Sequence, residues 1–479
     1  MKKLSLIPLG ISAIIIFYTL SLMNYIPVFT LDDAYIVQYS VHQIIDSSHE
    51  NIFLGSNENS GLTSLIHVSI VTLFSYFINV NWAHFFVASI CFFLFLQVIF
   101  LYAQKVKLDN LSTILIIIIA AFSGFILEQF FNGLETGLLI FTITTVLFLF
   151  RKPSPENILS LPILTILPFI RPELVFLSAI LFVRFIYFSL RNKQYDILFK
   201  GLITLIISAF LVISYSIFMT KGVLPNTANA KKFFFAEACK SFDERKFFLI
   251  SGVLKYLSSL GIASLGFLFI IFTRYRNVFL AFILCFYTLY FYELPGGIHH
   301  NFYRYQYVFY AFAIVGFIEF CALKHIPKIN RYLFICTIFV IFSINKNFEQ
   351  FYNSLKFTQN ENITVGAWVK NNLTKSDTIL IHDAGYISMV SPSKLVDLVG
   401  LKTSASIEIN KNTRFLNCGN DPRAIDAIAT NYKVTHFIVL DGWDRIFQLT
   451  NSLKYMGWNV TRVDDLRGNS AYKVYKISK

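Results

Sequence analysis

The sequence predicts an α-helical protein that crosses a membrane many times and ends in a soluble α/β domain. Hydrophobic residues make up 55% of the 479 residues and charged residues only 14%, whereas globular chains carry about 25% charged residues. Apolar segments of membrane-spanning length recur up to about Asn345, and beyond it the chain becomes polar. The mean hydropathy of +0.59 agrees with this fold class.

The membrane part is predicted from apolar segments that alternate with basic clusters. The segments capable of crossing a bilayer are residues 4–29, 62–80, 82–103, 111–128, 134–150, 157–170, 174–190, 199–219, 247–272, 277–293, 306–323 and 331–345. Cytoplasmic loops are rich in Lys and Arg. The clusters that mark the cytoplasmic side are Lys105/Lys107, Arg151/Lys152, Arg191/Lys193, Arg274/Arg276 and Lys324/Lys328/Arg331.

The sides of the loops set the expected number of crossings. Lys2 and Lys3 precede the first segment, so the N-terminus is predicted to be cytoplasmic and the loop 30–61 extracytoplasmic. With Lys105 inside, residues 62–103 must cross an odd number of times, yet they hold two apolar segments. We therefore expect 62–80 to be re-entrant or to lie along the interface. This gives about 11 crossings and an extracytoplasmic C-terminus.

The C-terminal residues are predicted to form a separate soluble domain. Short apolar runs typical of strands occupy 378–382, 394–397, 434–440 and 472–477, with helical stretches such as 365–372 between them. We expect a transmembrane domain at 1–345 and an α/β domain at 346–479, which is long enough to form its own core.

Composition and motifs argue against several classes of function. The net charge of +13 comes without a basic stripe interleaved with stacking aromatics, so it suits loop charges and anionic lipid partners, and we expect no nucleic acid. The six cysteines include no CxxC pair and lie mostly in apolar runs, which predicts neither a disulfide frame nor a metal site. The sequence has no P-loop, GxGxxG or HExxH motif for ATP, NAD or zinc-protease chemistry.

Two adjacent carboxylates follow the first apolar segment. Asp32 and Asp33 follow the segment 4–29, with only Thr30 and Leu31 between. A carboxylate carried to the membrane centre costs roughly 2.5–3.5 kcal/mol, so an acidic pair at a helix exit is a candidate site. The plain alternative is a solvated loop. A divalent cation at Asp32/Asp33 is a further alternative, since hard cations bind carboxylate oxygens, although the sequence shows no other ligands for it.

Most other unusual polar residues fall on the same predicted side of the membrane. They are Glu58, Glu135, Arg171, Asn226, Lys231, Lys232, His299, His300 and Arg304. Each has a structural alternative, because Arg171-Pro172 can end a helix, the two histidines can be an interfacial pair, and the lysines can reach lipid headgroups. Their gathering on one rim predicts a polar cavity at the membrane surface.

Several of these residues stand in motifs that resemble a known superfamily. The motifs, in order, are Asp32-Asp33-Ala34-Tyr35-Ile36, Asn57-Glu58 with Gly61-Leu62-Thr63-Ser64, Gly133-Leu134-Glu135-Thr136, Arg171-Pro172-Glu173, Leu224-Pro225-Asn226-Thr227 with Ala230-Lys231, Arg304-Tyr305, Asp383-Ala384-Gly385 and Asp397-Leu398-Val399-Gly400-Leu401. This ordered set resembles the GT-C superfamily of integral-membrane glycosyltransferases, and within it the AftB-like arabinofuranosyltransferase branch. The chain departs from the pattern around Asn57 and Ser64, which lack the expected Pro-Gly and Pro-Leu-Trp, and at Ile298, where many relatives carry an acidic residue.

The resemblance implies a multi-helix enzyme that takes a sugar from a polyprenyl-phosphate carrier on the extracytoplasmic face. Such enzymes place an essential acidic residue in the first extracytoplasmic loop, here Asp32 or Asp33. We favour Asp32 slightly as the base that takes the proton of the acceptor hydroxyl, although the sequence does not rank the pair.

Roles for the remaining polar residues follow from the same scheme. We expect fixed cations to bind the donor phosphate, namely Lys231, Lys232, Arg171 and Arg304. We expect the substrate-binding residues to be Tyr35, Glu58, Glu135, Asn226, His299 and His300. The expected partners are a polyprenyl-phosphate sugar donor, a cell-envelope glycan or glycolipid acceptor, and the bilayer. The expected location is a bacterial inner membrane with a periplasmic C-terminal domain.

Two other functions remain open at this point. A transporter or flippase of lipid-linked sugars would carry ionisable residues in the middle of several spans, whereas here they cluster at segment ends. A non-catalytic envelope protein would bind glycan through its C-terminal domain.

Overall fold

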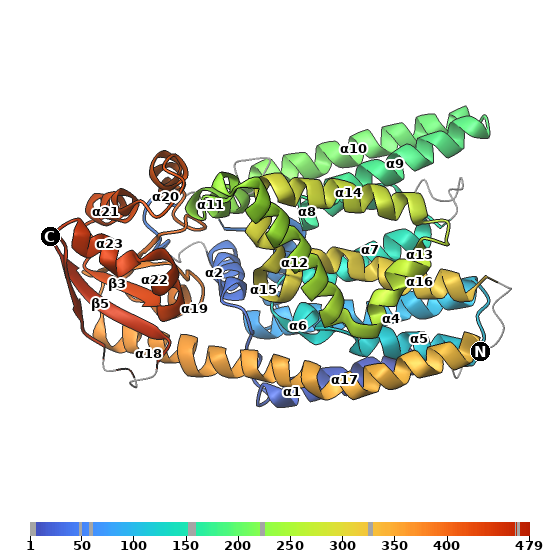
Figure 1. Ribbon diagram of the computed structural model, residues 1–479, viewed down its shortest axis with the longest axis horizontal. Coiled ribbons are helices and arrows are strands. Elements are labelled where there is room, and N and C mark those ends of the chain that lie inside the picture. Colours follow the sequence, from blue (N-terminus) through green and yellow to red (C-terminus); the bar gives the residue numbers. More distant parts are fainter. Residues whose placement is uncertain are drawn as a thin grey trace.

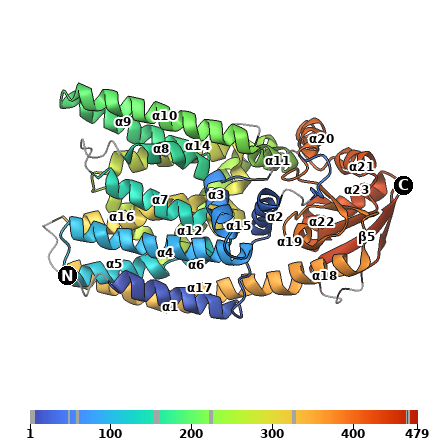
Figure 2. The same ribbon diagram turned by 180° about the vertical axis from the view of Figure 1, so that it is seen from behind.

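The molecule is elongated, with a long helical part, which begins at α1 (Ile7–Leu22) and ends with α17 (Ile329–Phe357), and a smaller C-terminal domain, which follows α17 and holds the β-sheet, at one end (Figure 1). The computed structural model describes residues 6–46, 50–56, 61–151, 160–220, 226–323, 329–464, 466 and 470–479. Most of the long helices lie along the long axis, and the helix α17 runs the length of the helical part before it reaches the C-terminal domain (Figures 1 and 2).

The helical part consists of helices joined by short turns. The helices are α1 (Ile7–Leu22), α2 (Asp33–Ile45), α3 (Leu65–Ser75), α4 (Val80–Lys105), α5 (Asn110–Phe122), α6 (Ile126–Phe131), α7 (Thr136–Leu149), α8 (Pro162–Ile170), α9 (Leu174–Arg191), α10 (Tyr195–Thr220), α11 (Thr227–Phe234), α12 (Phe242–Leu260), α13 (Leu265–Ile270), α14 (Arg276–Glu293), α15 (His300–Tyr303), α16 (Tyr310–Cys321) and α17 (Ile329–Phe357). The short helical segments used below are the 3₁₀ helices η3 (Glu237–Cys239), η5 (Pro295–His299) and η6 (Arg304–Phe309), and the π-helix η8 (Lys411–Phe415) in the C-terminal domain.

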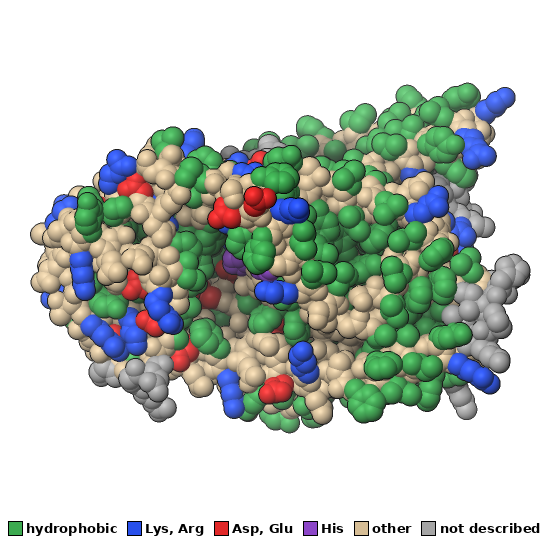
Figure 3. Space-filling model, in the orientation of Figure 1, with side chains coloured by type: hydrophobic (Ala, Val, Ile, Leu, Met, Phe, Trp, Pro, Cys, Tyr) green, Lys and Arg blue, Asp and Glu red, His purple; other side chains and the backbone are tan. Residues whose placement is uncertain are grey.

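Several helices have the length and composition of membrane spans. In the described part of the chain, five segments qualify, and a sixth qualifies if the bent pair Arg276–Glu293 and Pro295–Cys321 forms one span. Hydrophobic side chains cover much of the helical part, while charged side chains gather on the C-terminal domain and at the opposite end (Figure 3). The protein is therefore a multi-pass membrane protein, and the figure of about 11 crossings stays a prediction because four further apolar helices have only 10–17 residues.

The segment 62–80, expected to be re-entrant or interfacial, contains α3. This helix has 11 residues, about half of the roughly 20 that a crossing needs. It begins where the Ser64 hydroxyl accepts a hydrogen bond from the His67 N–H, a typical N-cap. The side of the membrane on which each loop lies stays a prediction.

The C-terminal domain is built on a five-stranded sheet. Its strands are β1 (Thr378–Ile381), β2 (Lys394–Asp397), β3 (His436–Leu440), β4 (Asn459–Arg462) and β5 (Tyr472–Ser478), in the order β2-β1-β3-β5-β4. Its helices are α18 (Ile363–Asn372), α19 (Tyr386–Val390), α20 (Ala405–Asn410), α21 (Pro422–Asn431), α22 (Asp441–Phe447) and α23 (Leu449–Tyr455). The four predicted strands are confirmed, and they lie in one sheet at the C-terminal end of the chain. The strand β4 was not expected because it is short and mostly exposed.

Three neighbouring strands of this sheet run in the same direction. β1 is parallel to β2 and to β3, while β5 is antiparallel to β3 and β4. The carboxyl ends of β2, β1 and β3 therefore meet at one edge, which is where ligands bind in many α/β sheets. The residues that follow these strands line a cavity against the helical part.

The two parts share elements, so their cores interlock. The core of the C-terminal domain includes Ile36 and Tyr39 from α2, Phe53, and Ala230 and Phe234 from α11. Residues 52–54 also pair with β2, through hydrogen bonds between the backbones of Ile52, Leu54 and Leu395. The division at residue 345 stays a prediction, because it falls within the continuous helix α17.

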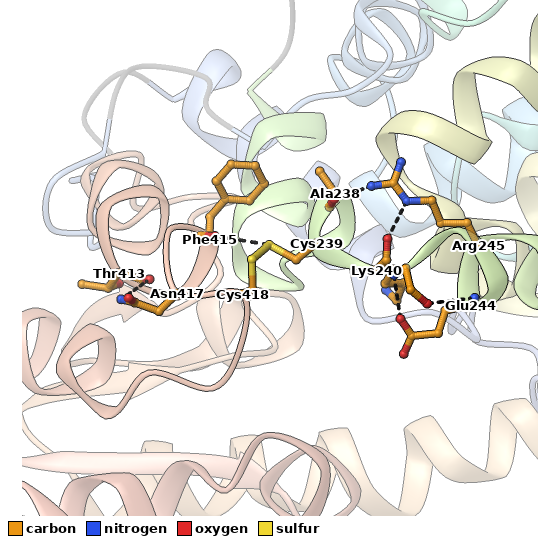
Figure 4. Close-up of a disulfide and its surroundings, with 10 residues drawn as sticks. Ala238, Cys239, Lys240, Glu244, Arg245, Thr413, Phe415, Asn417 and Cys418 are labelled. Carbon is orange, nitrogen blue, oxygen red and sulfur yellow. Dashed lines mark hydrogen bonds between the residues drawn. A yellow bond between two sulfur atoms is a disulfide. The ribbon is translucent and has the colours of Figure 1, made fainter.

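A disulfide joins the two parts, which corrects the prediction that the cysteines form none. Cys239, at the end of η3, is bonded to Cys418, and their Cα atoms are 5.2 Å apart (Figure 4). The spacing of 179 residues gave no local signal in the sequence. Both cysteines lie on the predicted extracytoplasmic side, where disulfides persist. The other four cysteines are free, as expected.

Candidate active site

Asp32 holds the C-terminal domain against the helical part. It precedes α2, and its carboxylate accepts hydrogen bonds from the backbone N–H groups of Gly385 (2.7 Å) and Tyr386 (2.8 Å) and from the amide of Asn362 (3.3 Å). Burial and repulsion by Asp383 raise the pKa of Asp32 to about 7, although the two backbone donors oppose the shift. The carboxyl of Asp32 is thus engaged in docking two parts of the chain.

Asp33 faces a different environment. Its Oδ2 lies 3.7 Å from the Arg304 guanidinium and 3.9 Å from the Lys231 ammonium, and the side chain is 30% exposed. Burial raises the pKa of Asp33, but the nearby charges of Lys231, Arg304 and His300 lower it by more, so its pKa falls below the usual value. Asp33 is therefore an ionised, accessible carboxylate at neutral pH.

The cations opposite Asp33 are organised by Tyr305. The Tyr305 hydroxyl accepts hydrogen bonds from Lys231 (3.2 Å) and Arg304 (3.5 Å). The Arg171 guanidinium lies 4.4 Å from the centre of the Tyr305 ring, a cation–π contact. The result is a cluster of three positive groups around one aromatic side chain.

A strained turn presents Arg304 and Tyr305. Between η5 and η6 the chain has three consecutive residues with positive φ, namely Asn301 (46°), Phe302 (57°) and Tyr303 (62°). Residues other than Gly rarely adopt positive φ values, and such backbone strain often occurs at functional sites. This turn also carries His300.

Two of the predicted phosphate-binding residues already have carboxylate partners. Arg171 is 1% exposed and forms ion pairs with Glu173 and, at 3.8 Å, with Glu135. Lys232 pairs with Glu293 at 2.5 Å. Of the four predicted cations, Lys231 and Arg304 are the two whose charges face Asp33.

Four cavities lie around Asp33 and the cations at Tyr305, and Lys231 lines three of them. A polar cavity of about 140 Å³ contains Asp32, Asp33 and Lys231, and a small pocket of about 30 Å³ contains Asp33, Lys231 and Arg304. A mouth cavity of about 490 Å³ contains Lys231 and Lys232, and shares Thr63, Pro172 and Val175 with an apolar groove of about 410 Å³ along α8, α9 and α10. Histidine side chains lie at the hollow between the two parts of the molecule (Figure 3).

The six predicted substrate-binding residues are placed differently from one another. His300 lines the polar cavity and Glu135 lines the small pocket. Tyr35 is 4% exposed, with its hydroxyl accepting from the Phe29 N–H, and His299 contacts Phe248 O at 3.0 Å. Asn226 precedes α11 and is exposed. Glu58 lies outside the described residues.

Three polar or aromatic residues of the C-terminal domain line the polar cavity without having been predicted in the site. His382 and Asp383 follow β1, and Trp443 follows β3. The sequence contained a signal for them, because polar residues after parallel strands gather at one sheet edge. Asp383 stood in one of the motifs, but no role was assigned to it.

The residues do not fit a divalent cation at Asp32/Asp33. Both oxygens of Asp32 accept backbone hydrogen bonds, and Asp33 faces two cations. Within the described residues, no group of three or more His, Cys, Asp or Glu has metal-binding geometry.

Comparisons with known proteins bear on the fold. A family model described as a domain of unknown function (DUF8728) matches residues 350–475, and a comparison with curated proteins gives no match. Two solved structures of ArnT from Cupriavidus metallidurans are similar to this chain. One is bound to undecaprenyl phosphate (TM-score 0.55, 8% identity, 98% of this chain and 97% of that one). The other is in the apo state (TM-score 0.56, 9% identity, 98% and 96%).

A third structure, arabinofuranosyltransferase AftD from Mycobacteria, is similar with a TM-score of 0.48 and 13% identity, covering 98% of this chain and 40% of that one. The likeness to ArnT spans nearly the full length of both chains. The chain therefore shares the fold of ArnT. The AftB-like branch stays a prediction.

Proposed function

We propose that this protein is a membrane glycosyltransferase that moves a sugar from a polyprenyl-phosphate donor to a cell-envelope glycan or glycolipid. The reaction would take place on the extracytoplasmic face, with the C-terminal domain periplasmic in a bacterial inner membrane. One observation carries the proposal: an ionised carboxylate, Asp33, lies opposite Lys231 and Arg304, and Lys231 lines both the mouth cavity and the polar cavity that contains Asp33. The fold shared with ArnT supports it.

The donor fits the succession of cavities. Its polyprenyl tail is apolar and suits the groove lined by side chains such as Leu164, Phe169 and Ile213. Its phosphate would then lie at the mouth cavity, where Lys231 supplies a charge-assisted hydrogen bond. Lys231 also lines the polar cavity, so the sugar attached to that phosphate would reach Asp33.

The proposed transfer is a single displacement with inversion. The acceptor hydroxyl gives its proton to Asp33 and its oxygen forms a new bond to the anomeric carbon of the donor sugar. The bond between that carbon and the phosphate oxygen breaks, and its electron pair leaves with polyprenyl phosphate. Lys231 and Arg304 stabilise the negative charge that develops on the phosphate.

Donor binding would also prepare the base. In the free protein, Lys231 and Arg304 lower the pKa of Asp33 and so weaken it as a proton acceptor. A bound phosphate draws on the same two cations, and its own negative charge raises the pKa of a nearby carboxyl. Asp33 would thus become a better base when the donor is in place.

The test uses full-length protein reconstituted in lipid with a labelled polyprenyl-phosphate sugar and envelope glycan fractions as acceptors. Asp33→Asn is expected to lower product formation by about 10²–10⁴-fold, the usual contribution of a general base, while undecaprenyl phosphate still binds. Asp196→Asn is the matched control, since Asp196 is exposed on α10 and pairs with Lys200.

Wild-type turnover in Asp33→Asn would refute the assignment of the base. A flippase or a non-catalytic glycan-binding protein would bind lipid or glycan without forming a glycosidic bond. The absence of product from wild-type protein that binds undecaprenyl phosphate, over a full set of labelled sugars and acceptors, would therefore favour one of those two functions.

A further inference from the structure

The polar cavity is lined on one side by residues from the carboxyl ends of three parallel strands. Val399 and Leu401 follow β2, His382 and Asp383 follow β1, and Trp443 follows β3. The opposite side carries Asp33 from α2. The C-terminal domain thus contributes half of a cavity whose other half holds the proposed base.

We propose that this half of the cavity is the binding subsite for the acceptor, and that it takes a neutral sugar ring. The proposal rests on the proposed function, and adds the acceptor's chemistry and the residues that recognise it. A sugar ring has an apolar C–H face and a rim of hydroxyl groups. Trp443 offers an aromatic surface to the apolar face, and His382 and Asp383 offer hydrogen-bonding groups to the hydroxyl groups.

The aromatic surface is fixed in place by its neighbours. Trp443 is half-buried, and its ring lies 4.9 Å from His382, 5.3 Å from Phe447 and 5.5 Å from Phe235, measured between ring centroids. Phe235 directly follows α11, which carries Lys231. The indole is therefore held close to the element that would bind the donor phosphate.

The polar groups have unused hydrogen-bonding capacity. Oδ2 of Asp383 accepts from the Tyr472 hydroxyl at 2.7 Å and lies 3.0 Å from His382 Nε2. Within the described residues both of these contacts of Asp383 use Oδ2, which leaves Oδ1 for a ligand. His382 is 3% exposed, and its Nδ1 has no hydrogen-bond partner in the described part of the chain. Buried polar atoms normally have partners, so this nitrogen indicates a ligand or water in the cavity.

Charge and size favour a neutral polyol. The carboxylates Asp32, Asp33 and Asp383 line the cavity together with one lysine, Lys231. Asp33 and Asp383 repel an anionic ligand and accept hydrogen bonds from hydroxyl groups, whereas both oxygens of Asp32 already accept backbone hydrogen bonds. The volume of about 140 Å³ is several times the roughly 10–15 Å³ that one water molecule needs, which leaves room for a sugar ring but not for an extended chain.

The test measures sugar binding separately from donor binding. Full-length protein in lipid nanodiscs is mixed with methyl mannopyranoside, methyl galactopyranoside or methyl arabinofuranoside at millimolar concentration. Binding is followed by saturation-transfer difference NMR, with empty nanodiscs subtracted. We expect a signal from at least one glycoside and a decrease in affinity of about tenfold or more in Trp443→Ala and in Asp383→Asn. Trp368→Ala is the matched control, because Trp368 lies on α18 away from the cavity. Undecaprenyl phosphate should bind equally well to all of these proteins.

Two results would overturn the subsite. Wild-type protein that gives no signal with any of the three glycosides is the first, and unchanged binding in both Trp443→Ala and Asp383→Asn is the second. Asp383→Asn keeps the side-chain shape, so it remains informative if Trp443→Ala does not fold. If the wild-type protein does not bind undecaprenyl phosphate, that result counts against the proposed function. The measurement of undecaprenyl phosphate binding is independent of the glycoside signal.

Discussion

Asp32 and Asp33 are adjacent in sequence, yet their surroundings move their pKa values in opposite directions. Burial and Asp383 raise that of Asp32, whereas Lys231, Arg304 and His300 bring that of Asp33 down against its burial. Pairs of carboxyl groups with separated pKa values often have separate roles. Here the separation favours Asp33 as the base and Asp32 as the residue that positions the C-terminal domain.

The first prediction concerns the acidic limb of the pH–rate profile. Lys231→Gln removes a charge that lowers the pKa of Asp33, so that pKa rises. A base is active when deprotonated, and the decline in kcat/KM towards acid should therefore begin at a higher pH than in the wild type. Donor affinity should also fall by about 1.5–3 kcal/mol, the usual value of a hydrogen bond to a charged group. Lys200→Gln is the control, because Lys200 is exposed on α10, pairs with Asp196 and lines none of the four cavities. An unshifted acidic limb in Lys231→Gln would contradict the electrostatic role.

The second prediction concerns stability. The folded-state pKa of Asp32, about 7, is above its ordinary value of 3.8, so folding favours the protonated form. Its contribution to stability is complete below the ordinary pKa and is lost as the pH rises through 7. Wild-type protein should therefore lose more thermal stability between pH 5.5 and pH 8.5 than Asp32→Asn does. Melting curves of both proteins at several pH values check this, and parallel pH profiles would contradict it.

The sequence located the carboxylate pair and the two cations that face it, but could not rank the aspartates. The backbone groups that hold Asp32 lie 353 and 354 residues further along the chain, and no local pattern encodes such a contact. The same limit applies to Arg171, whose burial against Glu135 and Glu173 became evident only from the fold.

At the scale of elements, the contact between α2 and the turn after β1 is tight. A Cβ atom added to Gly385 would lie 2.0 Å from the Asp32 carbonyl oxygen and 2.4 Å from its Oδ2. Position 385 therefore requires Gly because any larger residue would collide with Asp32. The backbone of Gly385 is not left-handed, so its conformation is not the reason. Docking of the C-terminal domain depends on this approach.

The third prediction follows from that contact. Gly385→Ala should destabilise the protein by roughly 1–3 kcal/mol, as overpacking usually does, and should make the C-terminal domain easier to cleave in limited proteolysis. Gly442→Ala is the matched control, because a Cβ at Gly442 meets nothing within 4 Å. Equal melting temperatures for the two variants would show that the contact does not matter for docking.

Element by element, the sequence predicted what local patterns control. The apolar runs 378–382 and 434–440 became β1 and β3 because both are buried strands of a parallel pair. β4 was missed because its residues, Asn459–Arg462, have little apolar character and are mostly exposed. The short helices around the site, such as α11 and α15, depend on tertiary contacts more than on periodicity.

For the whole molecule, the sequence predicted two domains, and the structure shows how closely they interlock. Phe53 and Phe234 precede residue 345 but contribute to the core of the C-terminal domain. Arg414, which is 1% exposed, donates to the carbonyl of Phe234 at 3.3 Å. These contacts place the carboxyl edge of the sheet over Asp33. They join residues that are far apart in the sequence, so changes in composition along the chain do not predict them.

The last prediction concerns the covalent bond between the two parts. The disulfide Cys239–Cys418 joins η3, next to α11, to the segment that follows η8 (Figure 4), so it limits how far the element carrying Lys231 can separate from the subsite at Trp443. Removing a disulfide that closes a long loop usually costs about 2–4 kcal/mol, because the unfolded chain gains freedom. The double variant Cys239→Ser/Cys418→Ser should melt at a lower temperature than the wild type, and dithiothreitol should lower the wild-type melting temperature without changing that of the double variant. Cys285→Ser, which removes a free thiol, is the control. If the reductant had no effect on the wild type, the bond would contribute nothing to holding the two parts together, and the noncovalent contacts of Asp32, Gly385 and Arg414 would have to suffice.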